Sequence, residues 1–232
     1  MAVGRHPPRI GGSAWPPVGA GVWFTKRPFV WRRAEVQAEE KVHSARRAEL
    51  ARAAARLFSQ RGYHGTSMQH LGDALGIQRG SLYAHIGSKE DLLFDVVDEG
   101  AERFLERAEK TLATPALASV KLRRLLVGHI ETAIEHLDAA TVFLNEWRYL
   151  SDEPRTLIQK KRDRYESILK EIIREGIAVG EFRADADISF AARLVLSAGN
   201  WTFAWYRPGG ELGPTEIGER FARLVLKGLE ER

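Results

Sequence analysis

The stretch from Thr66 to Leu93, TSMQHLGDALGIQRGSLYAHIGSKEDLL, restricts the fold of this chain more than any other part of it. Thr66 and Gln69 have the spacing of a capping box at the start of a helix, and Gly76 is placed to end that helix. A second short helix is predicted over residues 78–86, directly after this turn. Two short helices joined by a tight turn are typical of a helix-turn-helix, whose second helix enters the major groove of DNA.

The second of these helices, residues 78–86, has an apolar side and an opposite side of small residues. Leu82 and Ile86 share one side and are expected to anchor the helix to the core, whereas Gly80 and Ala84 lie nearly opposite. The polar residues that flank this strip include types that hydrogen-bond to base edges and phosphates. An ordinary polar surface helix is the alternative, but it leaves the capped partner helix and the glycine turn unexplained. We therefore expect this helix to contact DNA.

A third helix is predicted to start at Ser88, because Asp91 follows three residues later, as in a capped helix start. Lys89 lies at the N-terminus of this helix, where the exposed N–H groups and the helix dipole favour an anion over a cation. A lysine at this place is explained if a DNA phosphate lies beside it. We therefore expect Lys89 to bind a phosphate.

The composition of the chain disfavours several classes of function. There is no cysteine among the 232 residues, which removes disulfides, thiol catalysis and cysteine metal sites. No glycine-rich phosphate loop occurs, and His64 and His70 are not spaced like metal ligands or catalytic residues. We therefore expect neither an enzyme nor a bound cofactor or metal. No run of about 18 apolar residues occurs, so we expect no membrane span and a cytoplasmic location. The net charge of +4 permits nucleic-acid binding.

Residues 1–44 differ from the rest of the chain. They are rich in proline, glycine and basic residues, and they also contain Trp15, Trp23 and Trp31. The prolines and glycines interrupt any helical pattern. We expect a poorly ordered extension that adds no function of its own. The alternative is a basic arm that follows DNA into the minor groove.

The remaining residues are predicted to form helices throughout, so the expected fold class is all-α. Residues 45–91 would be a three-helix, helix-turn-helix DNA-binding domain, and residues 92–232 a helical domain for ligand binding and dimerisation. Within the second domain, Asp187 opens one helix and Pro214 fits the first turn of the last one. Both of these helices have strong apolar faces. Two such helices from each of two copies would build a four-helix interface, so we expect a homodimer.

The segment GYHGTSMQHLGDALGIQRGSLYAHIGSKEDLL, together with the helix before it, resembles the DNA-binding signature of the TetR/AcrR repressors over about residues 47–97. The spacing of the whole set carries this resemblance, more than any single residue does. Ile86 departs from the pattern, because the family usually has an aromatic residue there. The resemblance implies phosphate contacts from Thr66 or Ser67, Tyr83, His85 and Lys89, and base contacts from Gln78, Arg79, Gly80 and Ser81.

The C-terminal part, over about residues 142–229, is similar to one branch of these repressors that controls fatty-acid or steroid breakdown and senses acyl-CoA thioesters. This resemblance implies a small-molecule effector of the acyl-CoA type in the C-terminal domain. In the apolar stretch FLNEWRYL, polar side chains must either pair with neighbouring helices or line a cavity. The residues predicted to line the cavity are Phe143, Glu146, Trp147, Arg148, Asn200, Trp201 and Trp205.

We expect a repressor that leaves a near-palindromic operator when its effector binds. The basic run of Lys160, Lys161, Arg162 and Arg164 is either a solvated helix face or a cluster at a cavity mouth that meets a phosphorylated ligand. The alternative function within DNA binding is a multidrug-type sensor that represses an efflux transporter gene. A purely structural helical protein is the remaining alternative.

Overall fold

The computed structural model describes residues 29–230, with side chains from residue 45 onwards except that of Arg79. Every regular element in this range is a helix, as predicted. In the part of the chain that the structure describes, no helix is both long enough and apolar enough to cross a bilayer. The elements are α1 (Phe29–Gly65), α2 (Met68–Leu75), α3 (Arg79–Tyr83), α4 (Lys89–Leu112), α5 (Ala118–Glu135), α6 (Leu137–Asn145), the 3₁₀ helix η1 (Trp147–Tyr149), α7 (Asp152–Ala178), α8 (Ile188–Asn200), α9 (Thr202–Trp205) and α10 (Pro214–Leu229).

Helix α1 begins earlier than the sequence predicts. A helical pattern is expected only from about Ser44, whereas α1 begins at Phe29, directly after Pro28. The reason is that residues 29–61 contain neither proline nor glycine, so nothing in this stretch interrupts the helix. The Pro- and Gly-rich part of the expected extension, residues 1–28, lies outside the described residues, and the minor-groove arm stays a prediction.

The end of α1 is fixed by a glycine and a buried threonine. Gly62 has φ of +73° and breaks the helix before its last residues, which suits a residue without a Cβ. Thr66 is buried, and its hydroxyl donates hydrogen bonds to the carbonyls of Leu57 (3.2 Å) and Gly62 (3.0 Å). This threonine therefore holds the turn between α1 and α2.

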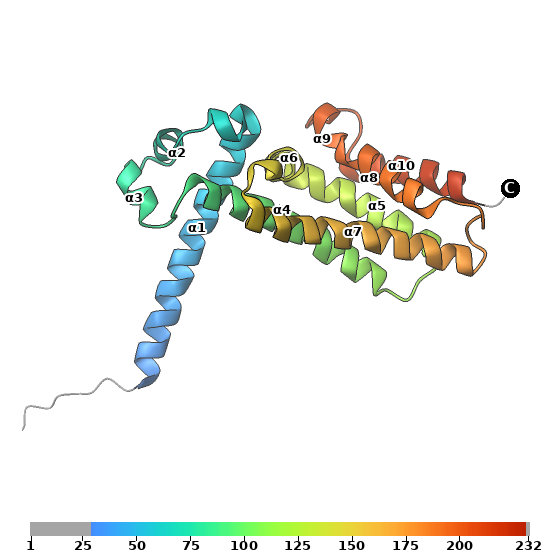
Figure 1. The fold of residues 1–232 in the computed structure, drawn as a ribbon, viewed down its shortest axis with the longest axis horizontal. Coiled ribbons are helices and arrows are strands. Elements are labelled where there is room, and N and C mark those ends of the chain that lie inside the picture. The colour runs from blue at the N-terminus through green and yellow to red at the C-terminus, as the bar shows by residue number, and fades with distance from the viewer. Residues whose placement is uncertain (1–28, 231–232) are drawn as a thin grey trace, which may run out of the picture. The chain divides into compact units, whose positions relative to one another are not determined.

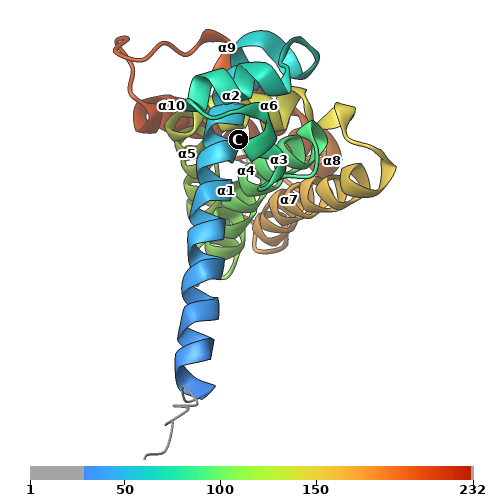
Figure 2. The same ribbon diagram turned by 90° about the vertical axis from the view of Figure 1, so that its left-hand side faces the viewer.

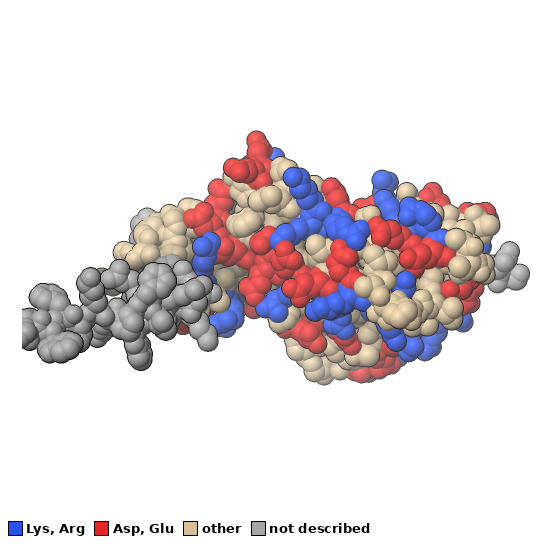
Figure 3. Space-filling model, turned by 90° about the horizontal axis from the view of Figure 1, so that it is seen from below, with Lys and Arg blue, Asp and Glu red and all other residues tan. Residues whose placement is uncertain are grey.

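The C-terminal helices α4 to α10 share one apolar core. Helices α4, α5 and α7 pack against one another, and α10 lies along α5 (Figure 1). Ion pairs join α4 to α7: the Lys161 ammonium contacts Asp98 and Glu102, and the Arg164 guanidinium contacts Glu109 at 2.8 Å. Basic and acidic side chains are accordingly interspersed on the face seen in Figure 3. Much of the positive charge in this domain is therefore neutralised locally.

Candidate functional site

Helices α2 and α3 form the helix-turn-helix, and they lie next to each other in Figure 2. Gly76 ends α2 with φ of +65°, and its N–H donates to the Asp73 carbonyl at 3.3 Å. The predicted capping box is displaced by one residue. Ser67, not Thr66, caps α2: its hydroxyl accepts from the His70 N–H, and the His70 ring accepts from the Ser67 N–H, both at 3.2 Å.

The predicted burial of Leu82 and Ile86 is confirmed, but the recognition helix is shorter than predicted: α3 ends at Tyr83, so Ala84 and Ile86 follow it and do not lie within it. Leu82 is fully buried and Ile86 is 4% exposed, so both anchor this segment to the core. Gly80 and Ala84, on the opposite side, are exposed. Ile86 fills its buried position although the family pattern has an aromatic residue there. The segment therefore presents a strip of small residues on its outer side.

Most of the residues predicted to contact DNA lie at the surface of this unit. Tyr83 is 44% exposed, and His85 is partly buried. The Arg79 side chain lies outside the described part of the chain, so its predicted base contact has no structural description. Thr66 is a correction, because its side chain is buried and its hydroxyl points back to α1. The other exposed members of the predicted set are Ser67, Gln78, Gly80 and Ser81.

Lys89 makes contacts within the chain that the sequence did not predict. Its ammonium donates to the carbonyls of Tyr63 (2.9 Å) and Thr66 (2.8 Å) and lies 4.2 Å from the centre of the Tyr63 ring. Partial burial lowers the pKa of this ammonium from its usual value. Lys89 therefore satisfies the carbonyls at the end of α1 and fixes α4 to it, which gives it a positioning role, and its phosphate contact stays a prediction.

Replacing Lys89 with methionine is expected to lower the free energy of unfolding by about 1 to 2 kcal/mol, because two charge-assisted hydrogen bonds are lost. Chemical unfolding measures this change. Lys110→Met is the matched control, since Lys110 lies on the same helix and its side chain is 79% exposed. A phosphate clamp would behave differently: Lys89→Met would leave stability unchanged and would reduce the salt dependence of DNA binding by the contribution of about one phosphate.

A cavity of about 250 Å³ lies in the C-terminal domain. Helices α4, α5, α6, α7 and α8 and the 3₁₀ helix η1 all contribute to its wall. Its wall contains the aromatic rings of Phe104 and Phe143, whose centres are 5.6 Å apart, and the ring of Trp147. The rest of the wall is largely polar: it contains His129, Tyr165 and Asn200 and, along α7, Gln159, Lys161, Arg162, Asp163 and Glu166. The cavity can therefore take a small molecule that joins an apolar part to polar groups.

Three of the seven predicted ligand-binding residues line this cavity: Phe143, Trp147 and Asn200. Glu146 faces the DNA-binding domain instead, where its carboxylate accepts from the Tyr63 N–H at 2.9 Å. Arg148 is exposed and donates to the Asn145 carbonyl at 2.8 Å.

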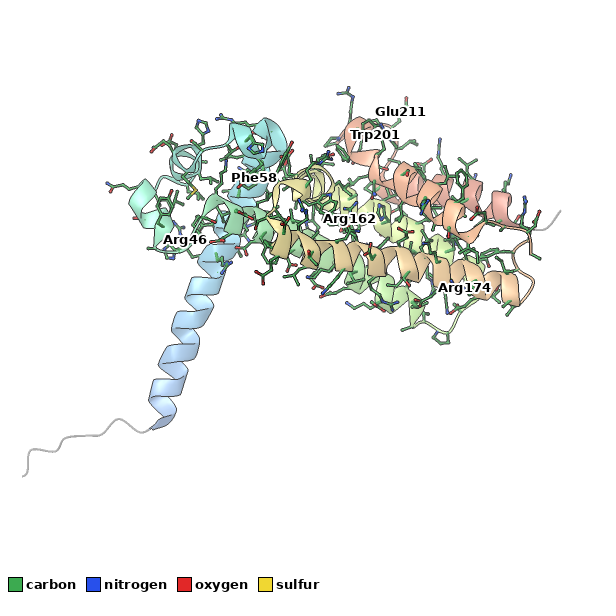
Figure 4. All side chains as sticks on the ribbon, in the orientation of Figure 1. Arg46, Phe58, Arg162, Arg174, Trp201 and Glu211 are labelled. Carbon is green, nitrogen blue, oxygen red and sulfur yellow. The ribbon has the colours of Figure 1, made fainter. Side chains whose placement is uncertain are left out.

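The two remaining predicted residues, Trp201 and Trp205, are 64% and 45% exposed and are absent from the cavity wall. They lie at the junction of α8 with α9 and in α9 itself, and Figure 4 shows Trp201 at that end of the domain. These two residues, Glu146 and Arg148 therefore do not line this cavity, and their ligand contacts stay predictions.

Arg162 is the cavity residue with the most unusual environment. Its guanidinium carbon lies 4.9 Å from the centre of the Trp147 ring and 5.2 Å from that of Phe143 (Figure 4 labels it on α7). Its basic neighbours Lys161 and Arg164 form salt bridges with carboxylates, whereas no salt bridge joins Arg162 to a carboxylate among the described residues, although the nearby Asp163 opposes the lowering of its pKa. Burial lowers the pKa of Arg162, although the guanidinium stays charged. The site therefore offers a desolvated cation between two aromatic rings.

His129 and Tyr165 form a buried polar pair in the same wall. The His129 Nδ1 and the Tyr165 hydroxyl are 3.0 Å apart. Burial lowers the pKa of His129 to about 4, against an opposing effect of Asn200, and burial raises the pKa of Tyr165. Both groups are therefore neutral at physiological pH.

No sequence pattern marks several of these residues as part of a site. Phe104, His129 and Tyr165 lie on long helices as ordinary members of a buried stripe. Arg162 belongs to the basic run, in which the sequence does not distinguish the members that pair with carboxylates. Only the packing of the helices shows which side chains converge.

Both halves of the chain match known families. Residues 50–96 match the model of bacterial regulatory proteins of the tetR family, and residues 116–229 match the tetracyclin repressor-like C-terminal domain. The chain is 32% identical to the HTH-type transcriptional repressor KstR2 of Mycolicibacterium smegmatis, over 81% of this chain and 92% of that protein.

Solved structures of similar proteins support the same family. The structure of the ketosteroid transcriptional regulator KstR2 of Mycobacterium tuberculosis has a TM-score of 0.77 and 26% identity, covering 81% of this chain and 96% of that one. The structure of AibR in complex with isovaleryl coenzyme A and operator DNA has a TM-score of 0.70 and 28% identity, covering 80% and 98%. On this similarity across both domains, the chain belongs to the TetR family of bacterial transcriptional regulators and is a DNA-binding repressor, not an enzyme.

Proposed function

We propose that this repressor controls genes of lipid or steroid breakdown and leaves its operator when an acyl-CoA-type thioester binds in the cavity. The observation that carries the proposal is Arg162, a cation without a salt bridge to a carboxylate among the described residues, held against the rings of Phe143 and Trp147 in a wall that has both apolar and polar parts. Such a wall suits a ligand that joins an apolar group to an anionic or strongly polar one. An acyl-CoA has both.

The similar proteins support the same class of effector. One of them has been solved with isovaleryl coenzyme A and operator DNA, and another is a ketosteroid regulator. Identities of 26% and 28% leave the effector of this chain to experiment. The cavity of about 250 Å³ fits an acyl group of modest size, with the CoA portion outside it.

The unpartnered apolar faces of α8 and α10 support a homodimer. Phe190 and Leu194 on α8 are 65% and 57% exposed, and Leu224 on α10 is 73% exposed. These helices line one apolar hollow of about 460 Å³. A contiguous apolar surface of this kind is typical of an interface between subunits. A dimer would place two recognition helices about one DNA turn, roughly 34–36 Å, apart on a near-palindromic operator.

The cavity wall also contacts the DNA-binding domain, which offers a route for release. Glu146, which lies between the wall residues Phe143 and Trp147 in the sequence but outside the wall itself, accepts the hydrogen bond from the Tyr63 N–H. Tyr149, just beyond, stacks on the Tyr63 ring with a centre-to-centre distance of 6.1 Å. An effector that displaces Trp147 would move these contacts and the end of α1. It can shift the equilibrium only by its difference in affinity for the two states.

Calorimetry with acyl-CoAs, the matching free acids and CoA alone tests the effector class, and a gel shift with the DNA upstream of the gene tests release. We expect heat with acyl-CoAs and release of the DNA by the same compounds. Binding of unrelated apolar drugs alone would contradict the proposal and favour a multidrug-type sensor.

Replacing Arg162 with methionine is expected to weaken acyl-CoA binding at least tenfold while the free protein stays folded. The methionine keeps an apolar stem between the rings and removes a desolvated charge, so the folding cost is small. Lys160→Met is the matched control, because Lys160 is an exposed neighbour on the same helix. Equal acyl-CoA affinity of the two variants would rule out an anion-binding role for Arg162.

A further inference from the structure

The wall of the cavity contains a buried polar atom that no described residue satisfies. His129 is only 7% exposed, and no described residue meets hydrogen-bond geometry at its Nε2, although the Asn200 side chain is close enough to raise the pKa of the ring. Buried polar groups in proteins are normally hydrogen-bonded, so an exception in a ligand cavity points to a group that arrives with the ligand.

The position of His129 is strictly determined. Its ring lies 4.9 Å from the centre of the Phe104 ring and 5.6 Å from that of Tyr165. On the Nε2 side it meets α8 at Gly199, where an added Cβ would lie 3.2 Å from Nε2. The next residue, Asn200, lines the cavity. The imidazole is therefore packed on several sides and cannot turn Nε2 elsewhere without disturbing the core.

The hydrogen-bond pattern assigns the proton of His129 to Nε2. If the Tyr165 hydroxyl donates to Nδ1, its hydrogen is satisfied and the ring N–H is at Nε2. The opposite assignment leaves both the phenol hydrogen of Tyr165 and the Nε2 lone pair without a partner. The first assignment leaves one unsatisfied group and the second leaves two, so the first is favoured. Because the pKa of His129 is about 4, the ring is neutral and Nε2–H is a single directed donor.

We propose that His129, with Asn200 beside it, forms a subsite that binds an acceptor oxygen of the effector, a carbonyl or hydroxyl oxygen, through Nε2–H. This inference rests on the proposed effector function and deepens it. Phe104 and Phe143 lie between this subsite and Arg162, since the Phe104 ring touches His129 and the Phe143 ring touches Arg162. The effector would therefore carry two polar groups separated by an apolar portion. The acceptor oxygen is either the thioester carbonyl or an oxygen on the acyl group.

Three matched probes distinguish the thioester carbonyl from an oxygen on the acyl group as the bound acceptor. They are hexanoyl-CoA, its thioether analogue S-hexyl-CoA, and 5-oxohexanoyl-CoA. Their affinities are measured by calorimetry for the wild type, His129→Phe and Phe104→Leu. We expect His129→Phe to weaken binding of the probe that carries the recognised oxygen about tenfold or more and to leave S-hexyl-CoA unchanged. Loss with hexanoyl-CoA identifies the thioester carbonyl, and loss with 5-oxohexanoyl-CoA alone identifies an oxygen on the acyl group. Phe104→Leu should affect all three probes alike.

The outcomes separate the two proposals. Binding of the probes to the wild type with no selective effect of His129→Phe would overturn the subsite and leave the effector class intact. No binding of any probe to the wild type would overturn the acyl-CoA effector and the subsite together. Nitrogen NMR of the unliganded protein adds a readout that needs no ligand. A protonated Nε2 is expected, and a proton on Nδ1 would overturn the donor role.

Discussion

A Leu224→Glu variant is expected to be a folded monomer that binds operator DNA at least a hundredfold more weakly than the wild type. In the single chain Leu224 is 73% exposed, so the substitution removes no core contact. In a dimer built on α8 and α10, the new glutamate would place an unpaired carboxylate in the interface between the subunits, which is strongly unfavourable. The loss in DNA affinity follows because two linked half-site contacts gain about 10²–10⁴ over one.

Analytical ultracentrifugation measures the oligomeric state, and fluorescence anisotropy with labelled operator measures the affinity. Leu157→Glu is the matched control: Leu157 is also exposed, at 46%, but it lies on α7 outside the α8–α10 face. The control should stay dimeric and keep its affinity. A Leu224→Glu protein that is dimeric with unchanged affinity would show that the subunits meet elsewhere.

The helix-turn-helix was predictable because its signals are local. The burial of Leu82 and Ile86 follows from helical spacing, and the turn at Gly76 follows from a backbone that needs a positive φ. The choice between Thr66 and Ser67 as the cap was not local. Either residue can cap a helix, but the Thr66 hydroxyl already donates hydrogen bonds to the carbonyls of Leu57 and Gly62 at the end of α1.

The cavity was only partly predictable, because it depends on how separate helices meet. Phe143 and Trp147 were found from a dense apolar stretch, whereas the equally aromatic Trp201 and Trp205 are exposed. The sequence also places Lys89 where a phosphate contact is plausible on electrostatic grounds. The carbonyls that actually bind its ammonium come from residues more than twenty positions earlier, and a pattern along one helix cannot reveal them.

Acid is expected to destabilise this protein through His129. The pKa of His129 is about 4 in the folded state and about 6.5 in the unfolded chain, because burial disfavours the charged ring. Between these values the unfolded state binds more protons than the folded state, so the free energy of unfolding rises with pH. The stability that depends on the neutral His129 ring is fully present above about pH 6.5. It is lost as the pH falls towards about 4, at about 1.4 kcal/mol per pH unit.

The pKa of His129 is set by its burial and, in the opposite direction, by Asn200. Several charged residues share the two hollows that His129 lines, and their own titration is common to the wild type and to variants at this position. These are Arg107, Lys161, Arg162, Asp163 and Glu166. A variant that removes only the imidazole therefore isolates its contribution from the general effect of acid on carboxylates.

The measurement is urea unfolding across this pH range for the wild type and His129→Gln. The variant is expected to be less stable at neutral pH, because Tyr165 loses its partner, but its stability should fall less steeply with acid. The difference in slope should approach about 1.4 kcal/mol per pH unit. Parallel curves would mean that His129 titrates alike in the folded and unfolded states. In that case the imidazole would be accessible to water, and the closed, neutral donor on which the oxygen subsite depends would not exist.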